Sequence, residues 1–186
     1  MPAFVALLRA VNVGGTGKLP MAELRAMCEA EGCTQVQTYI ASGNVVFESE
    51  ASVEEIRAAL ESRFQHYAGK AIGVIIRTAA EMTAVLKGNP FPDAAPNRVI
   101  VHFLNDELPA DAVDQIKGRR NEQLRLGRRE IYVHYPEGQG TSKLVIPAAK
   151  IGTGRNINTV AKLAELASEV ISGAPVATRR VRHSSK

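Results

Sequence analysis

The run FVALL at residues 4–8 and the run GVII at residues 73–76 decide how this chain folds. Side chains alternate between the two faces of a β-strand, so a run without polar residues predicts a strand that is buried on both faces. A small sheet with helices on one face only would leave its other face open. We therefore expect a second layer over that face. The second half of the chain is the simplest source of this layer, and a homodimer partner is the alternative.

Helix and hairpin signals around these strands predict the order β-α-β-β-α-β for residues 1–78. Pro20 suits the first turn of one helix. A capping box of Ser52 and Glu55 begins the other helix. Between the two helices, residues 36–47 contain two short β-rich runs around a Gly-Asn turn, which indicates a hairpin.

The second half repeats this order of elements without visibly repeating its residues. A capping box of Thr78 and Glu81 predicts a short helix, and the Pro-rich residues 89–96 predict a linker. A strand, a helix, a hairpin and a last helix are then expected at residues 98–104, at 109–117, at 123–135 and from Asn156 or Asn158 onward. The final strand of the second unit has no clear apolar signal.

The predicted fold class is therefore α+β, with two tandem ferredoxin-like (βαββαβ) subdomains packed together and the second one degenerate. The expected divisions are a first subdomain at residues 1–78, a short helix and linker at 79–96, a second subdomain at 97–172 and a disordered basic tail at 173–186.

The composition is that of an ordinary globular protein. Of 186 residues, 45% are hydrophobic and 23% charged, which excludes wholesale disorder. The net charge of +4 is mild, and much of it lies in the last eight residues, so a nucleic-acid partner is compatible with the sequence but not required by it. Cys28 and Cys33 are too few for a zinc site or a disulfide framework, so we expect free thiols, no metal and a cytoplasmic location. Arg9 interrupts the first apolar run, and no run is long enough to span a membrane, so we expect no signal peptide and no membrane association.

A glycine-rich loop, VNVGGTGK at residues 11–18, resembles a phosphate-binding loop without matching either standard motif. Asn12 stands where a Walker motif has its first glycine, and Leu19 where it has a hydroxyl residue. Pro20 replaces the third glycine of a dinucleotide fingerprint. Glycine-freed backbone amides and a lysine before a helix N-terminus still favour an anion. A flexible turn between strand and helix explains the same residues.

The predicted topology brings this loop and the central hairpin turn to the same end of the first sheet, with Lys70 at that edge. The ligand-binding residues predicted in this way are Arg9, Asn12, Gly14, Gly15, Lys18, Ser42, Gly43 and Asn44, together with Arg155 and Asn156 before the last helix. This set contains no carboxylate pair, no histidine and no nucleophile beside a base, so it suits anion binding better than acid–base catalysis. Helix capping alone would also explain Asn156.

Other polar clusters have plainer explanations. His102 and His134 fall in predicted strands without a third metal ligand, which favours structural histidines. The arginines at 119–129 suggest a nucleic-acid face, but Glu122 and Glu130 interleave with them, which favours a solvated charged edge.

Several motifs, in this order, carry a resemblance to a known family. They are ALLRAVNVGG at residues 6–15, KLPMAELR at 18–25, YIASGNVVF at 39–47, NPF at 89–91, YPEG at 135–138, SKL at 142–144 and RNINTV at 155–160. This pattern resembles the bacterial domain of unknown function 1697 (DUF1697) family over roughly residues 3–170. The resemblance implies a pair of ferredoxin-like subdomains and no established activity. The family usually has tryptophan where this chain has Ile157, so no stacking role is carried over.

The sequence thus favours a cytoplasmic protein that binds a nucleotide, a phosphorylated metabolite or a nucleic acid at the glycine-rich loop end of its first subdomain. One alternative is an enzyme with a cleft between the subdomains, to which Lys143, His134 or Arg155 would contribute. Another is an assembly module. The sequence leaves open the cofactor, the oligomeric state and the role of the basic tail.

Overall fold

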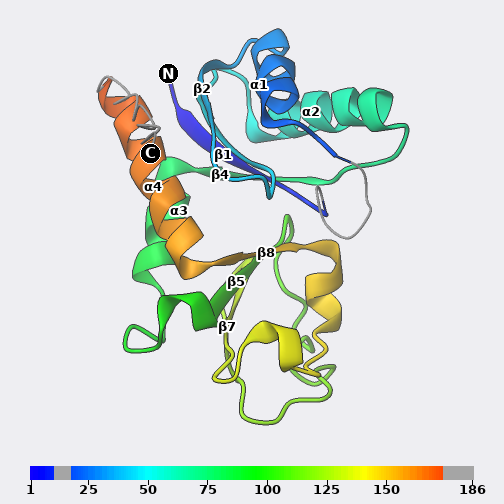
Figure 1. Ribbon diagram of the computed structural model, residues 1–186, viewed down its shortest axis with the longest axis vertical. Helices are drawn as coiled ribbons and strands as arrows, with labels where there is room; N and C mark the ends of the chain where they lie inside the picture. The colour runs from blue at the N-terminus through cyan, green and yellow to red at the C-terminus, as the bar shows by residue number, and fades with distance from the viewer. Residues whose placement is uncertain (11–17, 174–186) are drawn as a thin grey trace, which may run out of the picture.

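The computed structural model describes residues 1–10 and 18–173, which form two four-stranded antiparallel sheets and four α-helices (Figure 1). The elements are β1 (Ala3–Leu8), α1 (Met21–Ala30), β2 (Thr34–Thr38), β3 (Asn44–Glu48), α2 (Val53–Ala68), β4 (Val74–Thr78), α3 (Ala79–Lys87), β5 (Val99–Phe103), β6 (Gln123–Leu126), β7 (Glu130–His134), β8 (Thr153–Asn156) and α4 (Ile157–Ser172). None of the helices in these ranges has the length and apolar character needed to cross a bilayer.

The two sheets share one topology. The strand order is β2-β3-β1-β4 in the first sheet and β6-β7-β5-β8 in the second, with every neighbouring pair antiparallel. In each half the last strand leads directly into a helix, α3 after β4 and α4 after β8. The first half is built as its sequence predicts, and both predicted capping boxes are present.

The second half differs from the prediction in two places. Residues 110–115 form turns and Lys117 forms a β-bridge with Val145, so the helix expected at 109–117 is wrong. The segment has no continuous apolar stripe, because Ala112 is buried while Val113 is 55% exposed. A short 3₁₀ helix, Pro147–Ile151, precedes β8 where the first half has α2. The final strand that gave no apolar signal is β8, whose sequence is TGRN.

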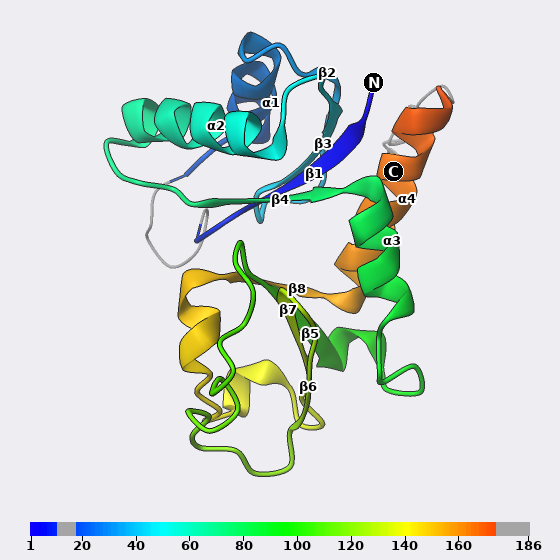
Figure 2. The same ribbon diagram turned by 180° about the vertical axis from the view of Figure 1, so that it is seen from behind.

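Strand β1 is buried on both faces, as its sequence predicts. Its even-numbered residues Phe4, Ala6 and Leu8 pack in one core with α1 and α2. Its odd-numbered residues pack in a second core with α3, α4 and strand β5. Figures 1 and 2 show α3 and α4 side by side next to both sheets. The second layer is therefore supplied by the same chain.

Side-chain oxygens cap the two equivalent helices at equivalent points. The Thr78 hydroxyl accepts a hydrogen bond from the backbone N–H of Glu81 at the start of α3. Asn156 Oδ1 accepts one from the N–H of Thr159 at the start of α4, at 2.9 Å. The cap of the last helix is thus Asn156, while Asn158 is exposed.

We expect Asn156→Ala to lower the free energy of unfolding by about 1 kcal/mol, because an orphan N–H at the start of α4 loses its acceptor. Asn158→Ala is the matched control and is expected to change it by less than about 0.5 kcal/mol. Urea denaturation of both variants measures the difference. Equal losses would show that Asn156 does not act as a cap.

Candidate functional site

Arg155 lies at the centre of the residues predicted to bind a ligand. It belongs to β8 and is only 7% exposed. Its Nε donates to Asn44 Oδ1 at 2.6 Å, across 111 residues of sequence. Its Nη1 donates to Thr153 Oγ1 at 2.6 Å and to the carbonyl of Gly154 at 2.9 Å. Within the second half, the guanidinium is thus held by neutral oxygens of its own strand.

The remaining contacts of Arg155 are with the first half. Nη2 donates to the carbonyls of Leu8 at 3.0 Å, Ser42 at 2.9 Å and Gly43 at 3.4 Å. Leu8 in turn donates its backbone N–H to Gly43 at 2.8 Å. The end of β1, the β2–β3 turn and β8 therefore meet at one guanidinium.

Arg9 crosses the junction in the opposite direction. Its Nε donates to the carbonyl of Gly152 at 3.2 Å and its Nη2 to that of Lys150 at 2.8 Å, both at the end of the 3₁₀ helix before β8. The side chain lies against Gly73, where an added Cβ would meet Arg9 Cδ at 2.9 Å. A residue larger than glycine at position 73 would displace Arg9.

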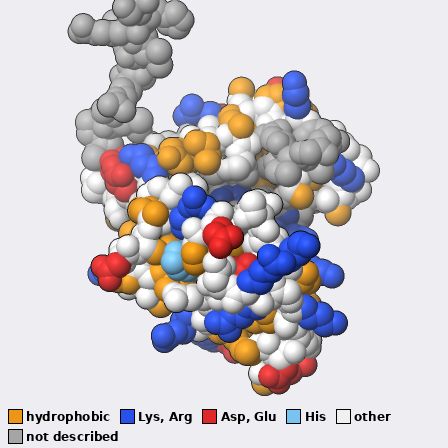
Figure 3. All heavy atoms as spheres, turned by 60° about the horizontal axis from the view of Figure 1, so that its bottom comes forward, with side chains coloured by type: hydrophobic (Ala, Val, Ile, Leu, Met, Phe, Trp, Pro, Cys, Tyr) orange, Lys and Arg blue, Asp and Glu red, His pale blue; other side chains and the backbone are white. Residues whose placement is uncertain are grey.

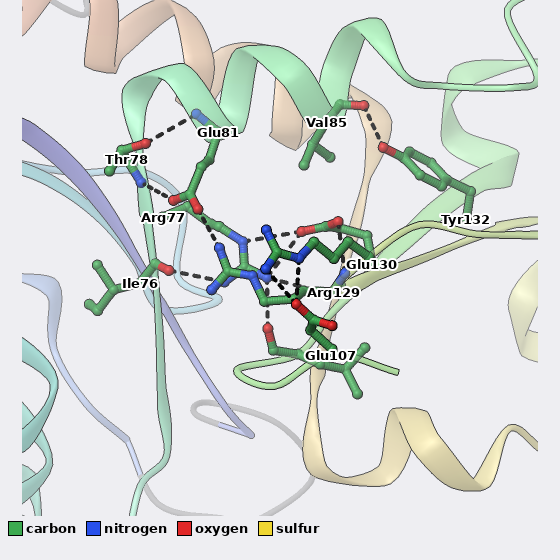
Figure 4. A network of polar contacts seen from close by, with 11 residues as sticks. Ile76, Arg77, Thr78, Glu81, Val85, Glu107, Arg129, Glu130 and Tyr132 are labelled. Atoms are coloured by element: carbon green, nitrogen blue, oxygen red, sulfur yellow. Dashed lines mark hydrogen bonds and ion pairs between the residues drawn. The ribbon is translucent and has the colours of Figure 1, made fainter. Parts of the chain in front are cut away.

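Arg77 in β4 makes the corresponding contacts from the first half to the second (Figure 4). It is fully buried and donates from Nη2 to the carbonyls of Leu104 at 2.7 Å and Arg129 at 3.2 Å. Its Nε and Nη2 bond Glu130 Oε1 at 3.2 and 3.1 Å, and its Nη1 donates to the carbonyl of Ile76. The guanidinium carbon also lies 5.7 Å from the centre of the Phe103 ring.

The two arginines occupy equivalent places in the two sheets. Arg77 pairs with Val5 in register, and Arg155 pairs with Val101. Each bonds the carbonyl of the preceding residue, the carbonyl at the end of the other half's central strand, and the first residue of the strand beside it. Each immediately precedes the N-cap of a helix. Each half therefore contributes one buried arginine that hydrogen-bonds to the other half, and we call this pair of contacts the arginine exchange.

The two arginines differ in the charge of the side chain that each one contacts. Arg77 meets the carboxylate of Glu130, whereas Arg155 meets the neutral amide of Asn44. Burial lowers the pKa of both guanidinium groups, that of Arg155 to about 10. The neighbouring Arg129 also lowers the pKa of Arg77, and Glu130 opposes both effects. No carboxylate within salt-bridge distance of Arg155 occurs in the described residues.

The other predicted site residues are distributed as follows. Ser42, Gly43 and Asn44 lie at Arg155, and Asn44 Nδ2 donates to Ser42 Oγ and to the carbonyl of Tyr39. Asn156 is committed to capping α4. Lys18 is exposed beside the segment 11–17. Asn12, Gly14 and Gly15 lie outside the described residues.

Two residues with unusual backbone conformations flank these contacts. Ala10 and Ile40 both have φ of 49°, in the left-handed region. That region is costly for a β-branched residue, and Ile40 is also half exposed. Such strain persists where the surroundings fix the backbone, and it often marks functional segments. Ala10 and Ile40 lie in the two chain segments that meet Arg155, but Gln35 in β2 also has a positive φ, of 51°, so this conformation is not specific to the site.

The alternative sites considered from sequence have structural roles. Arg119 bonds the backbone of Glu122, while Arg128 and Arg129 pair with Glu107 and Glu81. The His134 ring lies 5.7 Å from that of Phe91. Within residues 1–10 and 18–173, no group of three metal-ligating side chains forms.

The two cysteines are free and buried. Burial raises the pKa of the Cys28 thiol to about 12 and that of Cys33 to about 11, so both thiols are protonated at neutral pH. Reactivity requires the thiolate, so neither thiol is activated as a nucleophile.

The sequence reasoning missed Arg77. It follows the apolar run at 73–76 and reads there as the polar end of a strand. A signal was present, because both Arg77 and Arg155 directly precede a capping residue, Thr78 and Asn156. This pairing is a residue-level trace of the repeat.

The fold and the arginine exchange define a small α+β protein of two interlocked, similarly wound sheets. A sequence model described as "Protein of unknown function (DUF1697)" matches residues 1–132, and the chain belongs to this family. A conserved bacterial protein from Streptococcus pneumoniae has a similar structure, with a TM-score of 0.75 and 25% sequence identity. The alignment covers 89% of this chain and 98% of that one. A search of curated proteins gave no match.

Glu130→Gln tests whether Arg77 needs its counter-charge. We expect the free energy of unfolding to fall by about 1.5–3 kcal/mol, because glutamine keeps an acceptor but removes the negative charge, which leaves the buried Arg77 without a counter-charge. Glu107→Gln is the matched control. Its pair with Arg128 is largely exposed, so a change below about 1 kcal/mol is expected. Chemical denaturation measures both, and similar losses in the two variants would contradict the interpretation.

Proposed function

We propose that this protein binds an anionic ligand at the junction occupied by Arg9 and Arg155, with the glycine-rich residues 11–18 contributing to the site. The observation that carries the proposal is the environment of Arg155, a buried guanidinium whose hydrogen-bond partners within residues 1–10 and 18–173 are neutral oxygens. Its counterpart Arg77 has a carboxylate in the same position. A buried cation without a counter-charge is costly, and a bound anion would offset that cost.

Two further cations belong to the proposed site. Arg9 bonds backbone carbonyls, and Lys18 is exposed next to the segment. Residues 11–17 include no Asp or Glu. Figure 3 shows Lys and Arg side chains spread over one face of the molecule, with a few acidic side chains among them. Positive side chains that are partly shielded from water create a potential that attracts an anion.

Different residues are proposed for different parts of the binding. The donors of Arg155 are already occupied by protein oxygens, so this residue would act through its charge. Lys18 and the backbone amides at Gly14 and Gly15 would contact the anion directly, since glycine-rich turns before helices suit phosphate oxygens. Asn44, Ser42 and Gly43 would hold Arg155 in place.

The finer description of the fold belongs to the same proposal. We take each half as a ferredoxin-like unit, at residues 1–78 and 97–172, joined by residues 79–96. The common strand order supports this division. In the second unit, turns and 3₁₀ helices would then replace the two helices between strands. The free thiols agree with a cytoplasmic location.

The proposal is tested by titrating the labelled protein with pyrophosphate, ATP and an oligothymidylate, one at a time. The side-chain Nε–H signal of Arg155 and the amide signals of residues 9 and 42–44 are the readout. We expect saturable shifts with at least one of these anions. If all three leave these signals unchanged at low salt, the proposal is wrong. A response to the oligonucleotide alone, weakening steeply with salt, would identify nucleic acid as the ligand.

Lys18→Gln is expected to weaken anion binding about tenfold, which corresponds to about 1.4 kcal/mol of lost interaction. Lys87→Gln is the matched control, because Lys87 lies in the last turn of α3 and outside the proposed site. Isothermal titration calorimetry of both variants checks the difference. If Lys18→Gln binds as tightly as Lys87→Gln, direct contact by Lys18 is excluded.

A further inference from the structure

An open cavity of about 270 Å³ lies at the surface of the second half, next to the point where Arg9 donates to the carbonyl of Lys150. Its apolar wall includes Leu144, Ile146 and Ala149, from the segment that leads into β8. Polar groups reach it from His102 in β5 and from Tyr135 just after β7. Small-molecule sites combine a mostly apolar lining with a few convergent polar groups in this way.

The polar groups of this cavity include a neutral histidine–tyrosine pair and one lysine. His102 Nε2 lies 3.4 Å from the Tyr135 hydroxyl. Burial lowers the pKa of His102 to about 4, so its imidazole is neutral at physiological pH. Among the described residues that line the cavity, the charged side chain is that of Lys150, which is exposed. No Asp or Glu is found in the described part of the lining.

We propose that this cavity binds a small carboxylate with a single apolar ring. The ring would rest against Leu144, Ile146 and Ala149. The carboxylate would face Lys150 and the Tyr135 hydroxyl, two donors that suit one negative charge. A volume of about 270 Å³ lies just below the usual range for ligand pockets, which limits the ligand to a compact molecule.

The chemistry of the cavity favours binding over catalysis. A general base works best with a pKa near the operating pH, and His102 is far below it. The Tyr135 hydroxyl is held protonated, because burial raises its pKa and the nearby Glu122 raises it further. The cavity thus offers one cation and one hydroxyl donor, whose proton is available to the ligand when the neutral imidazole of His102 carries its own proton on Nε2. These groups orient a ligand without moving its protons.

This site adjoins the proposed anion site through the Lys150 carbonyl that Arg9 bonds, but its test uses different side chains. Amide shifts on titration with benzoate are the first measurement, with benzyl alcohol as the uncharged analogue. We expect saturable shifts around residues 102, 135 and 144–150 with benzoate, and binding of benzyl alcohol at least fivefold weaker. No saturable shift at these residues, or equal affinity for both probes, would overturn the proposal.

Variants separate the charge from the cavity. Lys150→Gln is expected to weaken benzoate about tenfold and to leave benzyl alcohol unchanged. Ala149→Leu would fill the apolar wall and remove binding of both probes, while Lys87→Gln would change neither. An unchanged benzoate affinity in Lys150→Gln would contradict the assignment even if Ala149→Leu fails to fold. Pyrophosphate binding at Arg155 would be retained in Lys150→Gln, so failure of one proposal is distinguishable from failure of the other.

Discussion

Two buried arginines that reach across the junction between the sheets constrain the rest of this structure. Arg77 ends in the second half and Arg155 ends in the first, and each bonds carbonyls where a central strand of the other half ends. Breaking either contact would leave a buried cation and several carbonyls without partners, a loss of several kcal/mol. The junction is therefore specified by polar contacts that only one arrangement of the halves satisfies. The apolar packing of β1 against α3 and α4 adds area without this directionality.

Arg77 and Arg155 occupy equivalent positions, so the difference between them lies in the residues that surround each guanidinium. Both guanidinium groups are nearly removed from water, and both bond three backbone carbonyls or more. They differ in whether a carboxylate balances the charge. Glu130 balances Arg77, while Asn44 gives Arg155 an acceptor without a charge. The proposed anion site lies at the place where this balance is missing, and the strained Ala10 and Ile40 lie beside it.

Parts of this structure were predictable from sequence because local chemistry determined them. The apolar run at residues 4–8 predicted a second layer, and the Ser52 and Thr78 capping boxes predicted two helix starts. The contact between Arg155 and Asn44 could be predicted only in part, because it depends on the order of the strands in both sheets. The hairpin signal determines only which strands are neighbours within a hairpin. Strand β8 was not found because TGRN has no apolar residue, and its pairing with β5 supplies its structure. The turns at residues 110–115 were predicted as part of a helix because two apolar residues at helical spacing are too few to distinguish the two.

The shared register of the two sheets has a consequence for how such a chain could arise. If two identical copies of one unit once paired about a two-fold axis, each would have placed its arginine in the other, and both contacts would have been the same by symmetry. In such a dimer, a change from a carboxylate to an amide alters both contacts at once. Joining the copies in one chain removes this restriction. One contact can then keep its carboxylate, as Glu130 does for Arg77, while the other has an amide, as Asn44 does for Arg155.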